Sequence, residues 1–156
     1  MIKSLVFSFL FTLPLLGCTH TEPGIRIEVV HLEPGQDLRK EIDAFVKAQQ
    51  IEAASILSAV GSLTQVTVRY ANKDNPAVLK GHFEVVALSG TTSLFGSHLH
   101  IAVADGDGKA TGGHLVDGSI VYTTMEIVLG VYPRLSFRRK LDPASGYKEL
   151  DVEARP

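Results

Sequence analysis

The stretch "GSHLHIAVADGDGKATGGHL", residues 96–115, contains three of the chain's six histidines. Its two apolar segments flank an aspartate- and glycine-rich turn at residues 105–108, a pattern that predicts a β-hairpin. His98 and His100 are two positions apart, so on a strand their side chains project from the same face. This hairpin therefore determines both the sheet in the second half of the chain and the placement of the histidines.

The position of His114 depends on the register of the hairpin. A two-residue loop would place His114 opposite Leu99, on the other face of the sheet. A three-residue loop at residues 106–108, or a bulge at residues 112–113, would place it opposite His100. In that second case three imidazoles can share one metal ion and leave one coordination position open. Zinc is the expected metal, and imidazole also suits copper, nickel or iron. The alternative is that the histidines only hydrogen-bond the backbone or line a subunit contact.

Outward from the hairpin, hydrophobic periodicity predicts the remaining elements. Residues 25–32 alternate as a half-buried strand, and residues 63–70 do the same. Asp37 is a candidate N-cap for a helix that extends to about Gln49. Residues 53–60 fit either a strand or a short buried segment. Helices in the first half and antiparallel strands in the second indicate the α+β class, with one sheet and helices packed on a face.

Composition limits the possible functions. The chain has 156 residues, 45% of them hydrophobic, which is enough for a single domain with a full core. It carries 15 Lys and Arg against 17 Asp and Glu, a poor match to the basic surface typical of nucleic-acid-binding domains. Cys18 is the only cysteine, so an intramolecular disulfide and a thiolate metal site are both excluded.

The first residues are typical of an export signal. Lys3 precedes an apolar run too short to cross a bilayer comfortably, so residues 1–17 are predicted to be a signal peptide. The ending "LLGC", residues 15–18, resembles the lipobox of bacterial lipoproteins, which implies a lipid anchor on Cys18 as the first mature residue. Residues 18–24 would then be a spacer. The implied location is the outer membrane, facing the periplasm; the alternative is a secreted or periplasmic protein.

Several separate motifs resemble the plants and prokaryotes conserved domain, known as PPC or PCC. They are "AASILSAVGSLTQVTVRY" (53–70), "GHFEVVALSG" (81–90), "HLHIAVADGDGKATGGHL" (98–115), "VYTTMEIVL" (121–129) and "FRRKLDPASGYKEL" (137–150). The resemblance implies one compact domain over residues 25–152, built on a bent antiparallel sheet, with residues 153–156 as a tail. It also implies homotrimers and the family's DNA-binding label. Relatives carry the same H-x-H and G-G-H motifs, which favours a metal site at His98, His100 and His114. The chain lacks the Arg-Gly-Arg-Pro hook of the plant DNA-binding members.

Two further groups of residues are candidates. Glu126 is an acidic residue in an otherwise apolar segment, so it is a candidate partner of an imidazole or a base acting on metal-bound water; it also fits a solvent-facing strand position. The basic cluster, which we define as Arg134, Arg138, Arg139 and Lys140, fits an exposed strand face or an anion or nucleic-acid site. The favoured function is a trimeric envelope protein that binds a divalent metal or a small ligand, with no reaction specified. DNA binding is the first alternative, and a metal-dependent hydrolase-like enzyme with Glu126 as base is the second.

Overall fold

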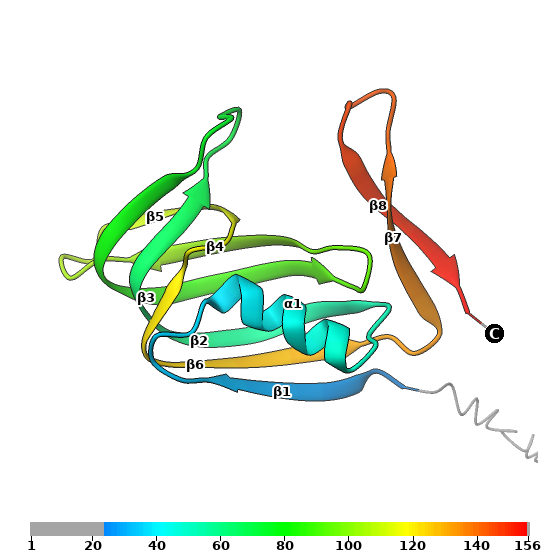
Figure 1. Cartoon of the computed structure of the whole chain (residues 1–156), viewed down its shortest axis with the longest axis horizontal. Helices are drawn as coiled ribbons and strands as arrows, with labels where there is room; N and C mark the ends of the chain where they lie inside the picture. Colours follow the sequence, from blue (N-terminus) through cyan, green and yellow to red (C-terminus); the bar gives the residue numbers. More distant parts are fainter. Residues whose placement is uncertain (1–23, 156) are drawn as a thin grey trace, which may run out of the picture.

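The computed structural model describes residues 24–155, so the predicted signal peptide, Cys18 and nearly all of the spacer lie outside the described residues. One helix and eight strands make up this part of the chain (Figure 1). They are β1 (Arg26–Leu32), α1 (Leu38–Ala48), β2 (Ala54–Arg69), β3 (Ala77–Thr92), β4 (His98–Ala104), β5 (Ala110–Leu115), β6 (Ile120–Val131), β7 (Leu135–Leu141) and β8 (Lys148–Ala154). Within residues 24–155, no helix has the length and apolar composition needed to cross a membrane.

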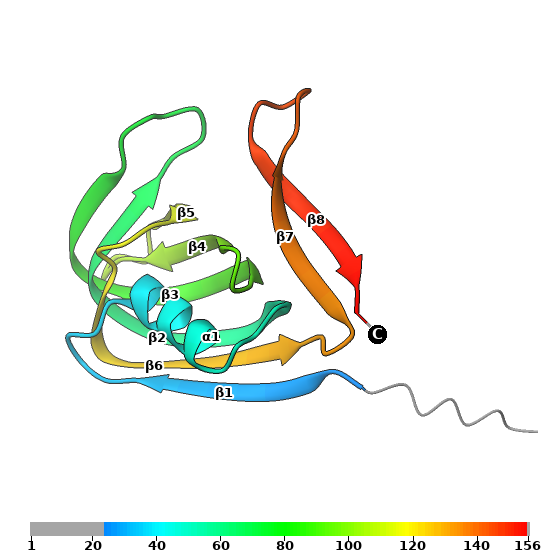
Figure 2. The ribbon, with the colours of Figure 1, turned by 45° about the vertical axis from the view of Figure 1, so that its right-hand side comes forward.

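Six of the strands form one bent antiparallel sheet. Their order is β1-β6-β2-β3-β4-β5, and β2 pairs with β5 as well. The end of β2 therefore closes the sheet back onto its last strand. Bulges interrupt the pairing of β2 with both β3 and β6, and bulges bend and twist the strand that carries them. The sheet curls around α1, while β7 and β8 form a separate hairpin beside it (Figure 2).

The helix forms where its sequence predicts it. The side chain of Asp37 accepts hydrogen bonds from the backbone N–H groups of Arg39 and Lys40, as an N-cap does. Leu38, Ile42 and Val46 recur every four residues, lie on one face and are all buried in the core that the sheet encloses. The predicted helix over residues 37–49 is confirmed.

The expected α+β class is corrected, because the described chain is mostly β and α1 is its one helix. Of the two alternatives for residues 53–60, the strand is correct, since all but Ala53 belong to the first half of β2. The strand shifts register at Gly61 and bends there, so it continues to Arg69 instead of ending. The bent antiparallel sheet and the single compact domain are confirmed. Strand β8 continues to Ala154, so it includes two of the residues that we assigned to the tail.

The first strand has an apolar outer face. Ile25, Ile27 and Val29 point away from the core and are more than half exposed, whereas Val30 and Leu32 are buried. The outer apolar face, which we define as Ile25, Ile27, Val29, Leu57 and Val60, extends across β6, because Gly130 has no side chain and Leu57 and Ile25 meet above it. Single exposed apolar residues are ordinary on a protein surface, but a contiguous group marks a contact region.

Gly90 permits the close approach of β3 to the histidine hairpin. Its φ of 131° is one that residues with a side chain rarely adopt, and a Cβ there would overlap the carbonyl oxygen of His98. The backbone of His98 therefore packs against Gly90, at a position where only the hydrogen atom of a glycine fits.

We expect Gly90→Ala to lower the free energy of unfolding by about 1–3 kcal/mol, because the added methyl group clashes with backbone and the φ is strained. Urea unfolding of the domain measures this change. Gly106→Ala is the matched control, since Gly106 has open space around it and lies in the hairpin loop. Equal stability of the two variants would contradict this account of the β3–β4 contact.

Candidate metal centre

The hairpin adopts the register that places all three histidines together. Asp105 and Lys109 are opposed across a three-residue loop, with the Asp105 N–H donating to the carbonyl of Lys109 at 3.1 Å. The Asp105 carboxylate accepts hydrogen bonds from the N–H groups of Asp107 and Lys109, and Gly108 adopts a φ of 76°. This turn places His100 directly opposite His114. The three-residue loop is confirmed, and pairing continues through Gly112 and Gly113 without a bulge.

The ring nitrogens of the three histidines converge on one point. His98 Nε2 lies 3.2 Å from His100 Nε2 and 3.2 Å from His114 Nδ1, and the remaining pair is 3.1 Å apart. Ligand atoms held at about 2.0–2.1 Å around a tetrahedral zinc lie roughly 3.3–3.4 Å from one another. The observed triangle is within a few tenths of an ångström of that spacing, so the donor set fits a metal ion.

Hydrogen bonds among the three rings cannot satisfy all three of these ring nitrogens. Each neutral imidazole nitrogen is either a donor or an acceptor, never both. In a closed set of three nitrogens, at least one pair must therefore bring two lone pairs or two N–H groups together at about 3 Å. A cation that accepts all three lone pairs removes this conflict, which favours metal coordination over hydrogen bonding as the purpose of the cluster.

The electrostatic surroundings favour neutral imidazoles. Burial lowers the pKa of His98 below its ordinary value of 6.5, and the neighbouring His100 and Arg139 lower it further. Burial also lowers the pKa of His114, together with the positive charge of Arg69, which lies directly opposite it on β2. Neutral rings are the form that binds a metal, so competition from protons is reduced.

Arg39 connects the helix to both ends of the histidine hairpin. Its guanidinium donates to the carbonyl of Leu115 at 3.1 Å and to that of Ser97 at 3.4 Å, the residues that adjoin His114 and His98. Asp43 holds Arg39 through an ion pair of 2.8 Å and accepts a hydrogen bond from the Ser97 hydroxyl. Arg39 is therefore a positioning residue for the cluster. Sequence reasoning missed it, because nothing in the local pattern of α1 signals contacts with residues 58 and 76 positions away.

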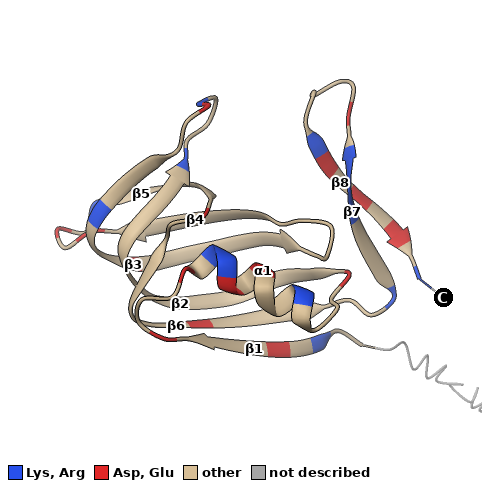
Figure 3. Ribbon diagram, in the orientation of Figure 1, with Lys and Arg blue, Asp and Glu red and all other residues tan. Residues whose placement is uncertain are grey.

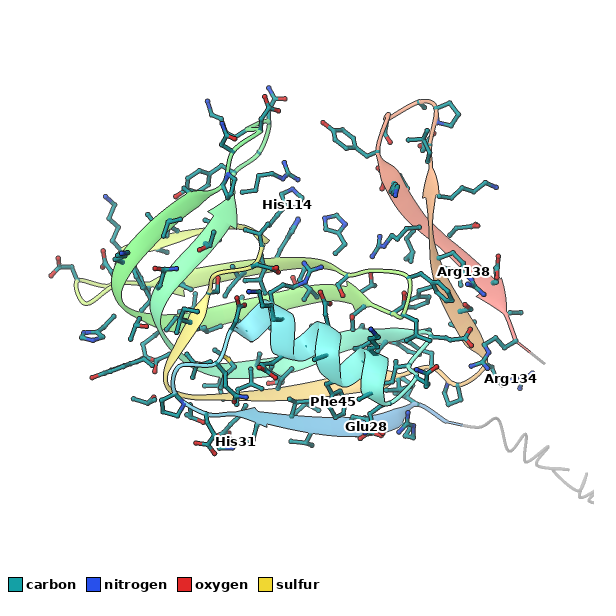
Figure 4. The ribbon with its side chains drawn as sticks, viewed as in Figure 1. Glu28, His31, Phe45, His114, Arg134 and Arg138 are labelled. Atoms are coloured by element: carbon teal, nitrogen blue, oxygen red, sulfur yellow. The ribbon has the colours of Figure 1, made fainter. Side chains whose placement is uncertain are left out.

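Glu126 is not brought together with the histidines. It is exposed on β6, opposite His31 on β1 and Val60 on β2, and neither strand carries a histidine of the cluster. His31 lies far from His114 and hydrogen-bonds Thr124 (Figure 4). Glu126 thus has the solvent-facing strand position that was its alternative interpretation.

The basic cluster is divided between two environments. Positive charges on β7 lie against negative charges on β8 (Figure 3): Arg138 opposes Asp151 and pairs with Glu153, and Lys140 opposes Glu149. Arg138 also lies over the ring of Phe95, and Arg134 lies at the base of the hairpin (Figure 4). Arg139 instead points toward β3 and donates to the hydroxyl of Thr91 at 2.8 Å. Burial lowers the pKa of Arg139, as expected for a guanidinium partly removed from water.

The fold and the site together define a small, mostly β domain that presents three converging histidines on a bent antiparallel sheet. The model of the Plants and Prokaryotes Conserved (PCC) domain matches residues 19–133, and the chain belongs to this family.

Solved structures support the fold. A protein from Salmonella enterica is 44% identical and superposes with a TM-score of 0.83, over 84% of this chain and 95% of the other. A protein from Archaeoglobus fulgidus, described as metal-containing, is 25% identical, with a TM-score of 0.70 over 82% of this chain and 94% of the other.

Curated relatives are longer proteins. The bifunctional protein GlmU of Synechococcus is 46% identical over 130 residues, which are 83% of this chain and 21% of that protein. The AT-hook motif nuclear-localized protein 13 of Arabidopsis thaliana is 31% identical in an alignment of 121 positions, which covers 70% of this chain and 27% of the relative. The chain thus spans only about a fifth to a quarter of the length of these relatives.

We expect the metal-free domain to lose stability as the pH falls through 6.5, the ordinary histidine pKa. The folded-state pKa values of His98 and His114 lie below those of the unfolded chain, so the unfolded chain takes up protons first. Their contribution is complete above pH 6.5 and is lost toward the lower, folded-state pKa values. Urea unfolding in the presence of a chelator measures the effect. The double variant His98→Gln, His114→Gln should show a shallower fall. A slope identical to that of the wild type would refute this assignment.

Proposed function

We propose that this protein is a homotrimeric binding protein of the bacterial cell envelope that holds a divalent metal ion, zinc in preference, at His98, His100 and His114. The convergence of three ring nitrogens within 3.2 Å of one another carries the proposal. The description of the Archaeoglobus relative as metal-containing supports it. Three imidazoles leave an open position on a tetrahedral ion, so a small ligand can bind the metal directly.

The outer apolar face supports assembly into a homotrimer. Val29 keeps 67% of its surface exposed and Val60 keeps 57%. Both lie on strands of the main sheet, and Ile25 and Leu57 of the same face meet over Gly130. Burial of this face against other copies of the chain would remove the apolar surface from water, at about 25 cal/mol for each Å² covered. The family resemblance favours three copies.

The envelope location rests on the sequence before the domain. The apolar run of residues 5–16 and the lipobox-like residues 15–18 support export and a lipid anchor at Cys18. In that location the metal centre would be displayed at a membrane surface on a short spacer.

DNA binding is the alternative that the name of the Arabidopsis relative favours. Phosphate binding needs cations free to neutralise a run of backbone charges. On the β7–β8 hairpin, acidic residues oppose Arg138 and Lys140 directly. The surface that the sequence singled out is therefore of mixed charge, which favours the metal-binding proposal.

The mature domain should bind one zinc ion per chain, whereas the double variant His98→Ala, His100→Ala should bind almost none, because two of the three ligands are gone. Equilibrium dialysis followed by elemental analysis provides the measurement. The matched control is His31→Ala, His82→Ala, which removes two exposed histidines of the same sheet. Equal zinc content in the two double variants would exclude the site.

The mature domain should elute as a species of three chains in size-exclusion chromatography with light scattering, and Ile27→Asp with Val29→Asp should release monomers. Two carboxylates on the outer apolar face would have to lose water in the interface, which costs several kcal/mol for each. Val152→Asp, at an exposed position on β8, is the control and should leave the mass unchanged. A monomeric wild type would contradict the trimer, and a trimeric Asp variant would place the interface elsewhere.

A further inference from the structure

A cavity of about 740 Å³ opens directly beside the histidine cluster. His98 and His114 line it on one side, from the main sheet, and Arg139 and Tyr147 line it on the other, from the β7–β8 hairpin. Figure 2 shows this hairpin standing apart from the sheet on that side. The volume lies within the range of about 300–1,000 Å³ typical of sites for small organic molecules.

The charge of the cavity wall is strongly positive. Four cationic residues, Arg39, Arg69, Arg139 and Lys148, line it, against one acidic residue, Glu149. Arg39 is already bound to Asp43 and to two carbonyl groups. Among the described residues, Arg69 and Arg139 have no carboxylate within ion-pair distance, and the recorded partner of the Arg139 guanidinium is the neutral hydroxyl of Thr91. Two guanidiniums at this wall are therefore available to an oxyanion.

The charge of a bound metal ion also requires an anion in the cavity. Three imidazoles are neutral ligands, so they leave the double charge of a divalent ion uncompensated. The group of possible metal ligands contains no carboxylate. Glu149, the one acidic residue of the wall, acts on His98 and Arg139 without being part of that group, and Glu126 lies elsewhere. A dication next to two guanidiniums is electrostatically unfavourable unless an anion lies between them. The open position should therefore be filled by an anionic oxygen.

Apolar side chains complete the wall. Phe95 lines the cavity and is partly exposed, and Tyr147 is two-thirds exposed at the tip of the hairpin, where its ring can cover a ligand. An inorganic anion would leave these surfaces in contact with water, whereas an organic body would cover them.

We propose that this cavity binds a small organic oxyanion, a carboxylate or phosphate ester, which places one oxygen on the metal ion and is held by Arg69 and Arg139. This inference rests on the proposed metal site. Arginine is suited to the role because its planar fork matches the two oxygens of a carboxylate or phosphate group. The protein would thus select ligands by an anionic head and an apolar body.

The test uses the mature domain loaded with cobalt(II) in place of zinc, because the visible spectrum of cobalt reports a change in its ligands. Benzoate and phenyl phosphate are the probes, inorganic phosphate tests the need for an organic body, and benzyl alcohol is the neutral control. We expect a saturable spectral change with benzoate or phenyl phosphate, weaker binding of inorganic phosphate, and none of benzyl alcohol. Arg69→Gln and Arg139→Gln should each weaken binding about tenfold or more, with unchanged cobalt content, because each removes a charge-assisted hydrogen bond.

Arg26→Gln is the matched control, since Arg26 lies on β1 and pairs with Glu28. It should bind the probes as the wild type does. Full cobalt loading with no response to either organic probe, or with equal affinity in the wild type and both arginine variants, would overturn this inference and leave the metal site intact. Failure of the wild type to take up cobalt or zinc would overturn both.

Discussion

The pairing of His100 with His114 is the constraint on which the rest of the site depends. It is fixed by a three-residue turn that the Asp105 carboxylate and the positive φ of Gly108 stabilise. Because side chains alternate along a strand, a shift of one residue would put His114 on the opposite face and leave a pair of histidines. The pairing of β5 with the end of β2 then places Arg69 opposite His114 and closes the cavity wall. A short turn thus determines the ligand set, the neighbouring charge and the shape of the site.

The three histidine rings also have to be held together although their nitrogens repel one another. Three ring nitrogens at 3.1–3.2 Å repel one another in at least one pair, so without a cation the rings would gain by moving apart. Contacts around the hairpin oppose this movement. Gly90 lets β3 pack against the backbone of His98, and Arg39 binds the carbonyls that adjoin His98 and His114. Such preorganisation keeps donors in position for a metal ion, and it explains why a helix far from the cluster in sequence matters to it.

Local patterns in the sequence predict this site better than its surroundings. The spacing of His98 and His100 is sufficient to place them on one face, and the turn residues restrict His114 to two registers. The helix after Asp37 was predictable from its cap and its fourfold repeat of apolar residues. The fold class was not predictable, because residues 53–60 fit two structures. The strand continues through the bulge near Gly61, which the sequence does not reveal. The apolar outward face of β1 was not predictable either, because an alternating strand does not reveal which of its faces meets the core. Arg39 and Arg69 join the site only through contacts that are distant in sequence.

The metal centre and the second wall of the cavity lie on separate sheets. The three histidines and Arg69 belong to the six-stranded sheet. Arg139, Tyr147 and Glu149, which form the second wall, all come from the β7–β8 hairpin. The hairpin forms its own two-stranded sheet and is joined to the main body by a few bonds, among them those of Phe137 to Glu52 and Ser93. Changes in its sequence can therefore alter the charge and the apolar cover of the cavity without disturbing the histidine register. The β7–β8 hairpin is thus the part of this chain whose sequence would determine which ligand the cavity accepts.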